Sequence, residues 1–146
     1  MLWSNLRIGR PAPNFFFEYL PGRGLTLRKL EGRPATLKFW KSSSRASLEA
    51  LRDLDETTRQ APPHGPVVLA INDGDAVELA KRIAAENKLS AIVVPDPKRS
   101  ISLAYGVNIW PTTVFIDAFG LVREIRYGRF GRERVGQAYQ ETTAAR

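Results

Sequence analysis

A short apolar segment that leads directly into a run of serines constrains this chain more than any other feature. Residues 35–40 read Ala-Thr-Leu-Lys-Phe-Trp, follow a proline and precede the serines at 42–44. A short apolar run between such boundaries is typical of a buried strand. A serine hydroxyl can accept a hydrogen bond from a free amide in the first turn of a helix. The segment therefore predicts a strand that ends at Trp40, followed by a helix from about Ser44 to Arg59.

Length and composition indicate one globular domain. The chain has 146 residues, of which 43% are hydrophobic and 25% are charged. A chain of this length can bury a substantial core without disulfides or metal. It has no apolar run long enough to cross a bilayer, and its first residues lack the basic and apolar regions of a signal peptide. We therefore expect neither a membrane span nor a signal peptide.

The remaining patterns alternate between strands and helices. Residues 66–72 and 91–94 are apolar runs typical of parallel strands, and the segment Pro95-Asp96-Pro97 is expected to stop the second directly after Val94. Asp75 and Glu78 fit a capping box at the start of a helix. The predicted elements are a hairpin at 15–27, helices at 75–87 and 98–105, a second hairpin formed by 112–117 and 121–127, and a last amphipathic helix containing Val135 and Thr142. This order predicts an α/β sheet with parallel strands in its middle.

The strand that ends in Phe39-Trp40, followed at a fixed distance by Ser44 and Ser47, resembles the active-site turn of thioredoxin-like proteins. In thiol-disulfide interchange proteins of the TlpA/ResA type, which resemble the redoxin (AhpC/TSA) domains, a Cys-x-x-Cys pair follows such a strand. The two serines stand where those cysteines are expected, and the chain contains no cysteine.

A second motif supports the same resemblance. Residues 106–117 read Gly-Val-Asn-Ile-Trp-Pro-Thr-Thr-Val-Phe-Ile-Asp, which is similar to the family segment whose proline is cis and lies against the active-site turn; we therefore expect a cis bond before Pro111. The resemblance implies an α/β thioredoxin fold: a central mixed sheet with flanking helices and an N-terminal β-hairpin. It predicts an N-terminal extension at 1–8 and a thioredoxin-like domain at 9–146.

The resemblance makes Ser44 and Ser47 the candidate catalytic positions and implies that they are inactive. In the family a thiolate attacks a disulfide, and a serine hydroxyl cannot replace it. A serine nucleophile would need a base, yet the only histidine, His64, lies in a loop beyond the first helix. One histidine without cysteines also cannot form a usual zinc site, so no metal or cofactor is expected. Lys38 stands where thioredoxins proper keep a buried acid.

Two explanations of the serines remain open. The chain has either lost its cysteines naturally, or it is a Cys-to-Ser variant of a thiol-disulfide oxidoreductase. The family often has tryptophan, proline, arginine and proline at four neighbouring positions, which here hold Ser43, Ala46, Leu48 and Arg52. Changes at so many positions favour natural loss.

A member without the dithiol can still bind a partner. The family groove lies between the turn and the proline loop, and it takes an extended peptide through backbone hydrogen bonds. Trp40, Trp110, Pro111 and Thr112 are expected to line it, although simple core packing of Trp40 is an equally good interpretation. We therefore expect a peptide or protein partner and make no prediction of oligomeric state. The family resemblance suggests a bacterial protein that acts outside the cytoplasm.

A different class of function rests on charge. The net charge is +7, and arginines concentrate near the C-terminus. This basic patch could bind an acidic partner or nucleic acid on a scaffold fold, but a solvated surface is the better interpretation because few aromatic residues accompany it. Its members are Arg123, Arg126, Arg129, Arg132 and Arg134.

Overall fold

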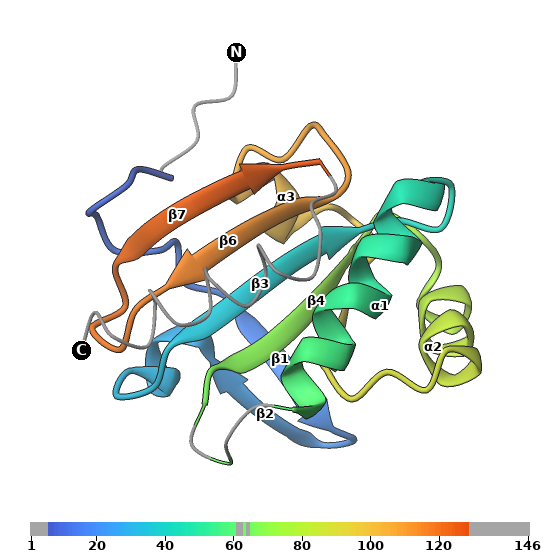
Figure 1. Ribbon diagram of the computed structural model, residues 1–146, viewed down its shortest axis with the longest axis horizontal. Helices are drawn as coiled ribbons and strands as arrows, with labels where there is room; N and C mark the ends of the chain where they lie inside the picture. The colour runs from blue at the N-terminus through green and yellow to red at the C-terminus, as the bar shows by residue number, and fades with distance from the viewer. Residues whose placement is uncertain (1–5, 61–62, 64, 129–146) are drawn as a thin grey trace.

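A computed structural model describes residues 6–60, 63 and 65–128 of the chain. Its main feature is a five-stranded mixed sheet with the strand order β5-β4-β3-β6-β7 (Figure 1). The strands of this sheet are β3 (Ala35–Trp40), β4 (Val67–Asp73), β5 (Ile92–Asp96), β6 (Thr112–Ile116) and β7 (Val122–Tyr127). Three helices accompany it: α1 (Arg45–Arg59), α2 (Val77–Glu86) and α3 (Ser100–Ala104).

Strand β3 is the middle of the sheet. It pairs parallel to β4 and antiparallel to β6, with Lys38 opposite Ala70 on one side and Thr113 on the other. All six of its residues are buried. Because β3 runs through the centre, its carboxyl end brings the start of α1 close to the segment that leads into β6.

The two faces of the sheet have separate cores. Side chains alternate between faces along a strand, so Leu37 and Phe39 join Phe17 and Tyr105 in one cluster, on the side of the N-terminal hairpin and α3. Trp40 joins Leu51 and other side chains in the second cluster, on the side of α1 and α2. In Figure 1, α1 crosses in front of the sheet and α3 lies behind it. The prediction of an α/β thioredoxin fold with a mixed sheet, flanking helices and an N-terminal hairpin is confirmed.

The hairpin forms a small sheet of its own. Strand β1 (Phe16–Leu20) pairs antiparallel with β2 (Arg23–Thr26), and the short 3-10 helix η1 (Leu27–Leu30) follows. Before it, the segment at 6–13 runs along the far edge of the main sheet, where the amide of Gly9 donates to the carbonyl of Val122. Leu6 is buried in the core, although it falls within the predicted extension.

Two local predictions were wrong. Asp75 does not form a capping box, because α2 begins after Ala76 and has no side-chain cap. The Asp75 carboxylate instead accepts hydrogen bonds from Ser42 and Asn72. Pro95 does not stop β5, which continues to Asp96. A proline is tolerated there because β5 is an outer strand, where one N–H group can be missing from the ladder. The predicted last helix lies outside the described residues.

Candidate functional site

Ser44 begins the first helix. Its backbone is extended, and its hydroxyl oxygen accepts a hydrogen bond from the amide of Ser47 at 3.1 Å. This is the N-cap geometry that satisfies one of the free amides of the first turn. Helix α1 therefore begins next to the end of β3, as the run of serines predicts.

Ser44 also connects this turn with the segment that precedes β6. Its hydroxyl donates to the carbonyl oxygen of Trp110 at 3.3 Å, across 66 positions in the sequence. The peptide bond between Trp110 and Pro111 is cis. The threonine that follows folds its hydroxyl back onto the carbonyl of Ile109 at 2.7 Å. The serine turn and the proline segment thus lie in direct contact.

Ser47 is completely buried, one helical turn further on. Its hydroxyl has no hydrogen-bond partner among the described residues, and the same holds for the indole nitrogen of the buried Trp40. A buried hydroxyl without a partner is costly. It also has no base within hydrogen-bond distance in the described part of the chain, so the geometry offers no activated serine nucleophile at this position.

Lys38 lies beneath the turn, on the same face of the sheet as Trp40. Its ammonium donates to the hydroxyl of Thr113 at 2.5 Å, and its side chain is almost completely inaccessible. Burial lowers the pKa of Lys38 to about 7, while the charge of Asp53 on α1 opposes this shift. A lysine with this pKa changes its charge near neutral pH.

Trp110 is held by a buried carboxylate. Its indole nitrogen donates to Asp73 Oδ2 at 2.6 Å, and Arg99 Nε donates to Asp73 Oδ1 at 2.8 Å. The ammonium of Lys41 lies 3.6 Å from the centre of an indole ring, a close cation–π contact. The sequence analysis missed Asp73, Arg99 and Lys41. The only available signal was an aspartate at the carboxyl end of a predicted parallel strand.

Asp75 holds the turn from the other side. Its two carboxylate oxygens accept from the amide and the hydroxyl of Ser42, each at 2.8 Å, and from the side chain of Asn72 at 2.9 Å. Burial opposes ionisation of this carboxyl, but the hydrogen bonds from Asn72 and Ser42, together with the charge of Lys41, lower its pKa. The loop after β4 therefore fixes the residues that lead from β3 into α1.

The expected groove residues differ in their accessibility. Trp40 had two interpretations, groove lining and core packing, and its side chain is fully buried in the α1 core, which agrees with core packing. Trp40 lies on the central strand β3, on the face of the sheet that α1 covers, and this position explains its burial. Pro111 and Thr112 are buried as well, whereas Trp110 is half-buried and Ile109 is 47% exposed. The accessible apolar surface here therefore comes from Ile109 and Trp110.

The described part of the predicted basic patch is paired with carboxylates. Arg123 Nε contacts Asp117 Oδ2 at 2.6 Å, and Arg126 forms an ion pair with Glu124. The other three arginines of the patch, at positions 129, 132 and 134, lie outside the described residues. An arginine that is paired with a carboxylate attracts a nucleic acid less strongly, because the pair carries no net charge.

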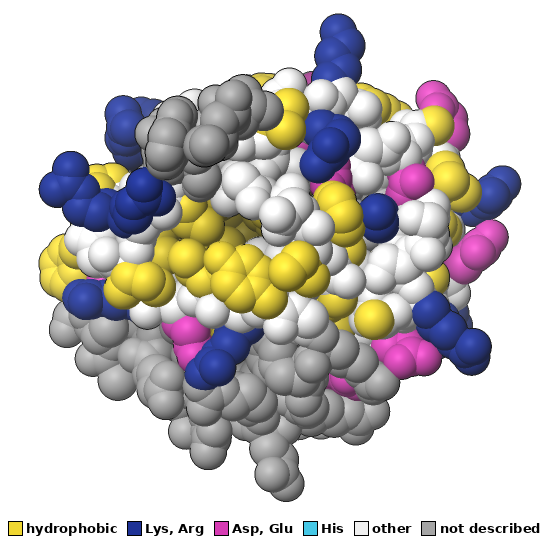
Figure 2. Space-filling view, turned by 90° about the horizontal axis from the view of Figure 1, so that it is seen from above, with side chains coloured by type: hydrophobic (Ala, Val, Ile, Leu, Met, Phe, Trp, Pro, Cys, Tyr) yellow, Lys and Arg dark blue, Asp and Glu magenta, His cyan; other side chains and the backbone are white. Residues whose placement is uncertain are grey.

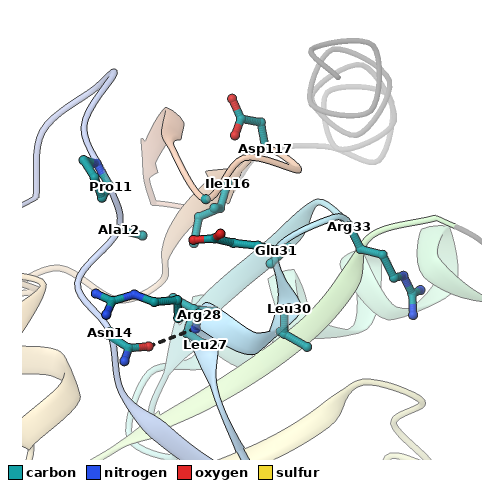
Figure 3. A pocket seen from close by; sticks show the side chains of 12 residues that line it. Pro11, Ala12, Asn14, Leu27, Arg28, Leu30, Glu31, Arg33, Ile116 and Asp117 are labelled. Atoms are coloured by element: carbon teal, nitrogen blue, oxygen red, sulfur yellow. Dashed lines mark hydrogen bonds between the residues drawn. The ribbon is translucent and has the colours of Figure 1, made fainter.

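A small pocket lies at the opposite end of β3 (Figure 3). Its lining comes from the N-terminal segment, η1 and the end of β6, and includes Pro11, Leu27 and Ile116. Its volume of about 40 Å³ has room for water and not for a metabolite. Neither this pocket nor the two larger grooves beside Val68 and Arg52 is lined by Ser44 or Trp110.

No group of three or more metal-binding side chains occurs within 6–60, 63 and 65–128. No helix in that part of the chain is long and apolar enough to span a membrane.

The fold, together with the contact between the serine turn and the proline segment, defines a thioredoxin-like protein. Comparison with known proteins identifies its family. The AhpC/TSA family matches residues 8–125, and the chain belongs to this family. It is 26% identical over 132 residues to the thiol-disulfide oxidoreductase ResA of Halalkalibacterium halodurans, covering 90% of this chain and 75% of that protein. It is 28% identical over 130 residues to ResA of Geobacillus thermodenitrificans, with 89% and 75% covered.

A solved structure has the same fold. A candidate thiol:disulfide interchange protein DsbE from Chlorobium tepidum superposes with a TM-score of 0.85 at 24% identity, covering 94% of this chain and 99% of that one. The present chain has no cysteine. It therefore has no thiol with which to exchange a disulfide.

Proposed function

We propose that this chain is a thioredoxin-fold protein without redox activity that binds an extended peptide segment of a protein partner. The binding surface comprises Lys41, Ser44, Ile109 and Trp110, which we call the turn face. The observation that carries the proposal is the direct contact of Ser44 with Trp110. This contact keeps the turn and the proline segment together although the chain has no cysteine.

The backbone and side chains of the turn face suit an extended peptide. The amide of Trp110 has no partner among the described residues, so it is free to donate to a peptide carbonyl. Pairing of this kind extends a strand and is largely independent of the partner's sequence. Next to it, Ile109 and the half-buried indole offer apolar contact area.

Apolar surface is gathered on this side of the molecule. Figure 2 views the structure from above, onto the side where Figure 1 has the loop between α3 and β6. Hydrophobic side chains cluster in the middle of this view, and Lys and Arg side chains stand around them. An accessible apolar surface with a polar rim is a common form of protein-binding site.

The proposal can be tested with random peptides. A bead library of random nonapeptides is screened with the folded chain, and a selected peptide is titrated into ¹⁵N-labelled protein. We expect amide shifts at 41–47 and 108–113, and loss of binding in Trp110→Ala. Selection of no peptide would refute the proposal, as would shifts confined to β7.

Two further variants make the test independent of folding. Ile109 is exposed, so Ile109→Glu should fold normally and still weaken binding. The matched control is Phe119→Ala, because Phe119 is 63% exposed in the turn between β6 and β7, at the other end of the sheet. We expect this control to bind the selected peptide as the unmodified chain does.

A further inference from the structure

We infer that the segment bound at the turn face carries an aspartate or glutamate that pairs with Lys41 beside Trp110. The inference rests on the proposed function and specifies the chemistry of the partner. It follows from how the charged groups around Trp110 are arranged.

The first step is that the indole cannot turn freely. Asp73 accepts both the indole N–H, at 2.6 Å, and the Nε–H of Arg99, at 2.8 Å. The Asp73 side chain is only 1% exposed, so this acceptor is shielded from water. The aliphatic part of the Arg99 side chain passes over Gly74, at van der Waals distance from the place that a Cβ would occupy. The indole of Trp110 is therefore held in one orientation.

The second step is that the ammonium of Lys41 lies against the indole of Trp110 and still has N–H groups that can donate to a ligand. Its ammonium lies 3.6 Å from the centre of an indole ring. It has no ion-pair partner in the described part of the chain, because the salt bridges there involve other residues. Asp75 acts on it only at longer range, and its oxygens already accept from Ser42 and Asn72. A cation that is already positioned loses little conformational entropy when it pairs with an incoming carboxylate.

The third step is that two neighbouring cations are more accessible than the carboxylates with which they pair, whereas Asp75 is partly exposed, as Lys41 is. The side chain of Arg99 is 41% exposed, against 1% for its partner Asp73. Arg45 is 93% exposed, against 38% for Glu49. The first turn of α1 holds no acidic residue. Positive charge therefore faces the solvent around the turn face, and it favours an acidic partner.

A nucleic acid is a less suitable ligand for this surface. Base stacking needs an open aromatic face. Lys41 already covers a face of the indole, and Arg99 lies 5.7 Å from a ring centre of the same side chain. One free ammonium next to a free backbone amide instead matches a carboxylate side chain on an extended peptide.

The experiment is a double-mutant cycle. A peptide is selected from the random library with the unmodified chain, and each acidic residue in it is changed to glutamine or asparagine. We expect at least one such change to weaken binding roughly fivefold. The same change should have no effect on binding to Lys41→Met. Lys41→Glu should in turn prefer the peptide in which that acid is replaced by lysine.

Control and contrary outcomes are distinct. Lys81 is exposed on α2 and is not a member of the turn face, so Lys81→Met should keep the full effect of the peptide change. Equal binding of acidic and amide peptides would refute the inference but leave peptide binding intact. Failure to select any peptide would refute the proposed function itself. Tighter binding of single-stranded oligothymidylate than of any selected peptide, abolished by Lys41→Met, would assign the surface to nucleic acid and also refute the inference.

Discussion

The two ends of strand β3 satisfy their buried polar groups very differently. At the Ala35 end, Asp117 is buried and both of its oxygens are used: the amides of Phe119 and Leu121 donate to Oδ1, and Arg123 donates to Oδ2. At the Trp40 end, Ser47 Oγ and Trp40 Nε1 are buried without partners among the described residues.

The difference shows that buried polar groups are fully paired at one end and left unpaired at the other. A thiol packs as a small apolar group and needs no hydrogen bond, whereas a hydroxyl does. Two relatives to which the chain is similar are named thiol-disulfide oxidoreductases. A thiol at position 47 would avoid the cost of the unpartnered hydroxyl that Ser47 places there.

The largest expected effect comes from restoring sulfur. Ser44→Cys with Ser47→Cys should form a disulfide between positions 44 and 47 and should catalyse the reduction of insulin by dithiothreitol. We expect a rate about tenfold or more above the uncatalysed reaction, because a thiol at a helix start has a lowered pKa. Ser44→Cys alone is the control and should form only mixed disulfides. Two thiols that still react with Ellman's reagent after oxidation would contradict this prediction.

The buried Lys38 predicts an unusual dependence of stability on pH. Burial lowers its pKa to about 7 in the folded chain, against a usual value of 10.5. Between these two values the unfolded chain binds more protons, so the free energy of unfolding should rise with pH, by at most about 1.4 kcal/mol per unit. The added free energy of unfolding is complete above the pKa of the unfolded chain, 10.5, and is lost as the pH falls through the pKa of the folded chain, about 7.

Urea unfolding at about pH 6, 8 and 9.5 measures this rise. Lys38→Met has no amine to titrate, so its free energy of unfolding should lack this contribution. Other groups titrate in both chains, so the difference between the two chains in how the free energy of unfolding changes with pH reports on Lys38 alone. Identical slopes in the two chains would show that the amine is not buried as described.

At the Ala35 end, Asp117→Ala should lower the free energy of unfolding by about 2–3 kcal/mol, because it leaves two amides and Arg123 without their acceptor. Chemical denaturation measures the loss. Glu31→Ala is the matched control, since Glu31 lines the same pocket but is exposed, and we expect it to change stability by less than about 0.5 kcal/mol. A small effect of Asp117→Ala would remove the contrast between the two ends.

The smallest effects have opposite signs within one turn of α1. Ser44→Ala should cost about 1 kcal/mol of stability, because it removes the N-cap. Ser47→Ala should instead increase stability by about 1 kcal/mol, because it removes a buried hydroxyl without a partner. Thermal unfolding of both variants gives the two signs. A destabilised Ser47→Ala would mean that its hydroxyl is hydrogen-bonded in solution.

The sequence predicts what depends on local pattern. The bounds of α1, the order of strands and helices, and the cap at Ser44 all follow from periodicity and serine chemistry, and they agree with the structure. The hydrogen bonds of Asp75 could not be predicted in this way. Its carboxylate could cap α2 or bind the turn before α1, and it accepts instead from Ser42, which is 33 positions away in the sequence.

The same limit applies to the candidate site. Trp40 and Trp110 are both aromatic residues beside a turn, yet one is fully buried and the other is half-buried. The place of Trp40 in β3 buries its ring in the α1 core, whereas contacts with Asp73 and Lys41 hold the ring of Trp110. The contacts of Trp110 with Asp73 and Lys41 join three segments that carry no common motif.

The two outer edges of the sheet have a consequence for self-association. Pro95 in the outer strand β5 lacks the N–H group that another strand would need. At the opposite edge, Val122 at the start of β7 already exchanges hydrogen bonds with Gly9 and Arg10. Open strand edges are where proteins stack into aggregates and fibrils. These two features hinder the addition of a further strand at either edge of the sheet.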